Sequence, residues 1–108
     1  MPDPALDATI AQARELLHDL GPLSVRKMFG GAGIYHDGTI FALIVDHEIL
    51  LKARDGFAEE MAALGSTQWV YEMKGKSGAM PYWSLPDSAL DDAEEATALA
   101  RRALEHLR

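Results

Sequence analysis

The chain has 108 residues, of which 48% are hydrophobic and 25% charged, and its formal net charge is −7. This length suits one domain over residues 1–108, large enough to fold without a metal or disulfide staple. The absence of cysteine excludes disulfides, thiolate nucleophiles and Cys-ligated metal centres. We find no secretion signal and no apolar run of the ~20 residues that a membrane helix needs, so we expect a cytoplasmic protein without a membrane partner.

The first predicted element is a helix that runs from Pro4 to Leu20. Asp3 can cap its start, and proline suits the first helical position. Gly21 and the proline after it end the helix. Apolar residues recur at helical spacing and predict the buried face, which consists of Leu6, Ile10, Ala13, Leu17 and Leu20.

A three-stranded antiparallel meander is predicted next. Its first strand contains a glycine cluster, Gly30, Gly31 and Gly33, where we expect a bulge or a close backbone approach. Asp37-Gly38 is typical of a type I′ hairpin turn, since both positions need positive φ. The predicted strands cover residues 25–36, 39–45 and 48–53, with a second turn at Asp46-His47.

The second half of the chain predicts a short helix, two strands and a closing helix. The helix covers residues 55–64, and the strands cover residues 68–73 and 79–83. After Pro86, the acidic pairs at 91–92 and 94–95 form a capping-box pattern before an Ala-rich helix. The order α-βββ-α-ββ-α predicts an α+β fold of two layers, a five-stranded, mostly antiparallel sheet with the helices on one face.

The strand over residues 39–45 is apolar on both predicted faces. One face carries Ile40, Ala42 and Ile44, and the other carries Phe41, Leu43 and Val45. A strand of this kind is covered on both sides, so we expect a homodimer or another partner on the second face. The alternative is that loops and neighbouring strands of the same chain cover it.

No pattern in the sequence predicts catalysis. The glycine cluster precedes a hairpin rather than a helix, and it lacks the Gly-Lys-Ser/Thr ending of a phosphate loop. The four histidines do not occur at zinc-ligand spacing. We therefore predict no catalytic residues, no metal, no cofactor and no enzyme activity. The histidines are His18, His36, His47 and His106.

Aromatic and basic residues gather in the middle of the sequence. Trp69, Tyr71 and Met73 alternate and share a predicted sheet face. Lys74 and Lys76 follow directly, as in surfaces that stack single-stranded nucleic acid. Core or interface packing of these aromatics is the alternative, and the acidic total favours it. Residues 25–86 hold seven acids and six bases, and the bases are Arg26, Lys27, Lys52, Arg54, Lys74 and Lys76.

The order of several short motifs resembles the N-terminal domain of the TfoX/Sxy competence regulators, from about Val25 to the end of the chain. No single motif is specific, but their order and spacing together are. The motifs are Arg26-Lys27-Met28-Phe29-Gly30-Gly31, Gly33-Ile34-Tyr35, Asp37-Gly38, Phe41-Ala42-Leu43, Leu51-Lys52, Tyr71, Lys74-Gly75-Lys76, Met80-Pro81-Tyr82-Trp83 and Leu85-Pro86.

The resemblance implies a two-layer domain similar to the secretion-chaperone-like architecture. It also implies a regulatory role, since family members act with the cyclic-AMP receptor protein at promoters, without established catalysis. Longer members carry a second, helical domain. We accordingly expect a non-catalytic protein-interaction module whose partner belongs to the transcription machinery. The alternatives are direct nucleic-acid binding and a small-ligand pocket near Trp69, Tyr71 and Trp83.

We expect the partner to contact a basic and aromatic strip. Glycines 30, 31 and 33 would bend the strand that presents it, and Gly38 would close the adjacent turn. The strip consists of Arg26, Lys27, Phe29, Lys52, Tyr71, Lys74, Lys76, Tyr82 and Trp83.

Overall fold

Six strands form one sheet in the order β1-β2-β3-β4-β6-β5, and all neighbouring strands are antiparallel. The computed structural model describes residues 3–28 and 30–107, and for Met73 it describes the backbone alone. The strands are β1 (Ser24–Met28), β2 (Gly31–His36), β3 (Thr39–Val45), β4 (Glu48–Lys52), β5 (Gln68–Met73) and β6 (Lys76–Ser84). The helices are α1 (Pro4–Leu16), the 3₁₀ turn η1 (His18–Leu20), α2 (Asp55–Ala63), α3 (Asp87–Leu90) and α4 (Ala93–Leu107).

The predicted α+β class, the antiparallel sheet and the first helix are confirmed, but the sheet has six strands instead of five. The Asp3 carboxylate accepts a hydrogen bond of 3.1 Å from the Leu6 amide and caps α1 as expected. The α-helix ends at Leu16, earlier than predicted, and continues as η1. A short helix, α3, also precedes the closing helix where none was predicted.

The sixth strand arises because the glycine cluster reverses the chain, so the predicted strand over residues 25–36 is two strands. Gly30 has φ of +77°, which only glycine adopts readily, and β1 pairs back on β2 with Met28 opposite Gly31. The expected close backbone approach is at Gly31, where a Cβ atom would lie 2.1 Å from the carbonyl oxygen of Ile44. The Asp37-Gly38 turn has positive φ at both residues, as predicted.

The assignment of residues 39–45 to two alternating faces is wrong at Ile40 and Phe41, which exchange faces. Tyr35 pairs with Ile40 and Ile34 pairs with Ala42, so Phe41 is an extra residue at a β-bulge. The bulge lets Phe41 join Ala42 and Ile44 in the core, all at 0% exposure. Ile40 takes the place of Phe41 on the second face, with Leu43 and Val45, so β3 leaves as many apolar side chains on this face as the alternation suggests.

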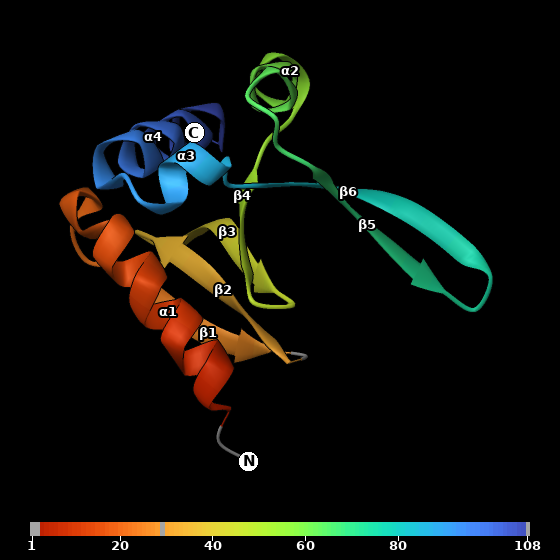
Figure 1. Ribbon diagram of the computed structural model, residues 1–108, viewed down its shortest axis with the longest axis horizontal. Coiled ribbons are helices and arrows are strands. Elements are labelled where there is room, and N and C mark those ends of the chain that lie inside the picture. Colours follow the sequence, from red (N-terminus) through yellow and green to blue (C-terminus); the bar gives the residue numbers. More distant parts are fainter. Residues whose placement is uncertain (1–2, 29, 108) are drawn as a thin grey trace.

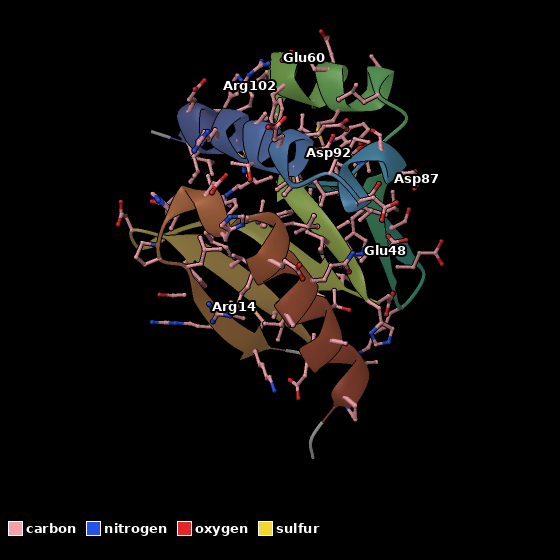
Figure 2. The ribbon with its side chains drawn as sticks, turned by 60° about the vertical axis from the view of Figure 1, so that its left-hand side comes forward. Arg14, Glu48, Glu60, Asp87, Asp92 and Arg102 are labelled. Carbon is pink, nitrogen blue, oxygen red and sulfur yellow. The ribbon has the colours of Figure 1, made fainter. Side chains whose placement is uncertain are left out.

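The helical layer covers one face of the sheet (Figure 1). Helices α1 and α4 pack on β3 and β4, and α3 packs on α4. The Asp92 carboxylate accepts hydrogen bonds from the amides of Glu94 and Glu95 and caps α4 as predicted. Figure 2 shows Arg102 of α4 beside Glu60 of α2, and the two side chains form an ion pair that joins these helices.

Strands β5 and β6 extend beyond the rest of the sheet as a two-stranded ribbon (Figure 1). Strand β6 pairs with β4 from Tyr82 to Ser84, and the Ala53 amide donates to the Pro81 carbonyl oxygen, so from residue 80 outward the hairpin strands pair with each other. We call residues 70–80 the arm. Within the described ranges, no helix is both long enough and apolar enough to cross a membrane.

Candidate interaction surface

The face of the sheet opposite α1 and α4 is called the open face. Directly paired residues of antiparallel strands share a face. Arg26, Gly33, Leu43 and Leu50 are successive partners across β1 to β4, and neither leucine belongs to the core cluster beneath the helices. This row therefore lies on the open face.

A glycine lets three larger side chains close over the middle of the open face. A Cβ atom at Gly33 would lie 2.9 Å from Met28 Cε, 3.0 Å from Ile40 Cδ1 and 3.2 Å from Tyr35 Cε1. Met28, Tyr35 and Ile40 are each partly exposed. Gly33 thus allows a continuous, partly apolar surface on β1, β2 and β3 that a larger residue would push apart.

Two cations on the open face lie over aromatic rings. The Arg26 guanidinium is 5.5 Å from the centroid of the Tyr35 ring, and Lys52 Nζ is 5.9 Å from the centroid of the Tyr82 ring. Lys52 and Tyr82 are paired neighbours on β4 and β6. A cation therefore lies over each ring, so an anion that approaches the open face contacts the cations before the rings.

Tyr82 lies near enough to Tyr35 and Arg54 for their charges to affect its phenol. Burial raises the pKa of the Tyr82 phenol above its ordinary value, the nearby Tyr35 hydroxyl raises the pKa further, and the Arg54 guanidinium partly opposes the shift. Arg54 is exposed and lies two residues after the end of β4, at the N-cap of α2. We call Arg26, Lys52 and Arg54, with the two tyrosines, the cation cluster.

An apolar groove of about 310 Å³ adjoins the cation cluster. Its side-chain walls include Met28, Leu43, Val45 and Trp69, and the remaining lining comes from the β1–β2 turn and from the end of β3 with Asp46 after it. Trp69 also lines a second, smaller opening with Val45 and Leu50, so its ring reaches from the base of the arm to the open face. Arg26 and Met28 are two residues apart on β1, which places Arg26 of the cation cluster about 7 Å along the strand from the groove wall.

The arm carries the most exposed apolar side chains of any strand that the structure describes. Val70 is 54% exposed and Tyr71 39% exposed. The Tyr71 ring lies across Gly78 on the paired strand, where a Cβ atom would come within 2.7 Å of it. Lys74 and Gly75 form a tight turn with positive φ at both residues, and this turn presents Lys74 and Lys76 at the tip.

The structure divides the residues of the predicted strip among four places. Arg26, Lys52 and Tyr82 lie on the open face, whereas Tyr71, Lys74 and Lys76 lie on the arm. Lys27 points to the helical side, where it pairs with Asp7 of α1 at 2.7 Å. Trp83 pairs with Leu51 and packs against the core. Phe29 is outside the described residues.

Sequence reasoning missed Arg54 and Tyr35 as members of this surface. Tyr35 alternates with Gly33 along β2, a signal that would have placed both on one face. Its partner Arg26 was on the predicted strip, but their contact needs the β1–β2 reversal, which the glycines alone did not reveal. Arg54 follows a strand end, where no periodic pattern indicates direction.

The described residues contain no cluster of three or more His, Cys, Asp or Glu side chains that could hold a metal ion. The Nδ1–H of His18 donates a hydrogen bond of 2.8 Å to the Glu15 carbonyl oxygen, and its Nε2 lies 3.0 Å from the Asp19 carboxylate; His18 and Asp19 are both exposed on the helical side. His106 stacks on Phe57 at 5.4 Å. Both histidines contact residues of the helical layer and do not adjoin the open face.

Comparison with known proteins bears on the role of this surface. Residues 15–107 match the family model of the TfoX N-terminal domain. The chain is also similar to Protein Sxy of Escherichia coli (strain K12), with 25% identity over 96 residues, which is 89% of this chain and 46% of that protein. The chain therefore spans about half the length of this curated relative.

Proposed function

Because the chain belongs to the TfoX N-terminal domain family, we propose that it is a non-catalytic regulatory module that binds a protein of the transcription machinery. The observation that carries this proposal is the open face, a partly apolar sheet surface with cations and no helix over it among the described residues. Interfaces are enriched in aromatic residues, Met and Arg, and this face offers all three.

The arm supports the same proposal. An isolated two-stranded ribbon is marginally stable in water, and this one exposes Val70 and Tyr71. Exposed apolar groups next to a basic tip are typical of elements that pack on a partner. The arm and the open face meet at Trp69, so one partner could contact both.

The test measures binding of the purified chain to purified cyclic-AMP receptor protein and to RNA polymerase from the same organism, by biolayer interferometry. We expect saturable binding to one of them. The variant Lys52→Glu/Arg54→Glu is expected to weaken it at least about tenfold, since charge reversal at an interface removes attraction and adds repulsion. The variant Lys74→Glu/Lys76→Glu reports separately on the arm.

The control variant is Arg14→Glu/Arg101→Glu, which changes the net charge by the same amount on the helical side. Figure 2 shows Arg14 on α1, on the helical side of the molecule. Absence of binding to either protein, together with an unchanged transcript profile when the chain is deleted from its cell, would contradict the proposal.

A further inference from the structure

The basic side chains of this protein fall into two groups by location. On the helical side, each described base has a partner: Lys27 pairs with Asp7, Arg102 pairs with Glu60, and Arg14 and Arg101 donate to the carbonyl oxygens of Leu23 and Asp19. On the open face and the arm, none forms an ion pair with a described residue. These bases are Arg26, Lys52, Arg54, Lys74 and Lys76.

This separation is unexpected in a chain with a net charge of −7, because acids outnumber bases by 17 to 10. A cation in such a chain finds an acidic neighbour easily, and the helical side shows this. The cation cluster lacks one because the neighbours of Arg26 and Lys52 on the sheet are the rings of Tyr35 and Tyr82. The cluster is thus left for an anion from outside the chain.

The adjoining groove limits what that anion can belong to. The groove of about 310 Å³ offers mainly apolar walls, Leu43, Val45 and Trp69 among them. Such a groove takes an apolar side chain, whereas the cation cluster, whose Arg26 is about 7 Å along β1 from Met28 of the groove wall, takes carboxylates. A ligand that uses both has an apolar anchor with acidic residues close to it in sequence.

We propose that the open face binds a short acidic segment of the partner protein, with an apolar side chain in the groove and carboxylates on Arg26, Lys52 and Arg54. This inference rests on the proposed function and names the chemistry of the partner. It goes beyond the family assignment, because it concerns which segment the face recognises.

Nucleic acid fits this face less well. Base stacking needs an uncovered ring, but Tyr82 is 6% exposed and both Tyr82 and Tyr35 have cations over them. A duplex also carries a negative charge every ~1.7 Å and would extend past the face to the acidic remainder of the chain. A short acidic segment avoids that repulsion, because its charges end where the cation cluster ends.

The experiment uses a fluorescein-labelled synthetic peptide of about ten residues, built from Glu and Asp with two central Leu residues. This length spans the open face, because an extended chain rises about 3.3 Å per residue. Fluorescence anisotropy with the full chain at ~50 mM salt is expected to show saturable binding that weakens at ~300 mM salt. A peptide with Ser in place of both Leu residues is expected to bind several-fold more weakly.

Variants of the chain locate the binding site. Lys52→Glu/Arg54→Glu is expected to bind the Leu peptide at least about tenfold more weakly. Leu43→Ser is expected to bind the Leu peptide and the Ser peptide with similar affinity, because the groove no longer favours the apolar side chain. Arg14→Glu/Arg101→Glu has the same charge change and is expected to bind as the wild type does. Circular dichroism of each variant confirms that it is folded before it is used.

Three results would overturn the inference. The first is no saturable binding of the Leu peptide at ~50 mM salt, where attraction between charges is strongest. The second is tighter binding of a labelled single-stranded or duplex DNA, lost in the same double variant. The third is a stable dimer by light scattering that Leu43→Glu dissociates, since a second copy would then cover the face. If the peptide fails while a transcription protein still binds, the proposed function stands and its contact lies elsewhere.

Discussion

The hydroxyl of Thr97 on α4 donates a hydrogen bond of 2.9 Å to the carbonyl oxygen of Leu16, the last residue of α1. Both residues are buried, and they lie 81 positions apart. The last carbonyl groups of a helix have no partner inside it, so Thr97 satisfies a group that would otherwise be buried alone. One side chain thus fixes the end of the first helix to the last helix.

Replacement of Thr97 by Val is expected to destabilise the fold by about 1–3 kcal/mol, because the Leu16 carbonyl loses its partner while the shape is kept. Thr9→Val is the matched control. Its hydroxyl donates to the Ala5 carbonyl at 3.1 Å within α1, a group that the helix itself can satisfy. Urea denaturation measures both variants, and equal losses at the two sites would contradict the role given to Thr97.

Alanine substitutions at Gly30 and Gly31, in the β1–β2 turn, are expected to lower the free energy of unfolding by unequal amounts. Gly31→Ala is expected to cost about 3 kcal/mol or more, because its Cβ would lie 2.1 Å from the Ile44 carbonyl oxygen in a central strand. Gly30→Ala meets no atom within 4 Å and carries only the cost of positive φ, about 1–2 kcal/mol. Thermal denaturation ranks the two variants, and a larger loss at position 30 would refute the close approach at position 31.

The raised pKa of Tyr82 predicts loss of stability in alkali. The folded state holds the phenol proton more tightly than the unfolded chain, whose tyrosine pKa is about 10. The stabilisation is therefore complete below pH ~10 and is lost as the pH rises through the folded pKa of Tyr82. Urea denaturation from pH ~8 to ~11 is expected to show a steeper decline for the wild type than for Tyr82→Phe. Parallel declines would show that Tyr82 is not the group responsible.

The lysines at the arm tip are expected to matter for binding and not for stability. Lys74 and Lys76 are exposed and have no ion pair with a described residue, so Lys74→Glu/Lys76→Glu should change the free energy of unfolding by less than about 0.5 kcal/mol. The amount of a transcription protein that this double variant binds is expected to fall. A destabilised variant would indicate that the tip packs on the body, and undiminished capture would remove the arm from the partner surface.

The local features of the fold followed from the sequence because each depends on a few neighbouring residues. The cap at Asp3, the turn at Asp37-Gly38 and the strand over residues 68–73 are as predicted. Turn and cap preferences act through steric limits and hydrogen bonds within a few positions, which a single sequence displays.

Only the tertiary structure decided the register of the sheet and the neighbours of each charge. The bulge at Phe41 moves one aromatic ring from the open face to the core, and the reversal at Gly30 creates the sixth strand. The basic residues looked alike in the sequence, yet Lys27 pairs with Asp7 of α1, whereas Arg26 lies over the ring of Tyr35. Such outcomes depend on contacts between residues far apart in the chain, which composition and periodicity do not encode.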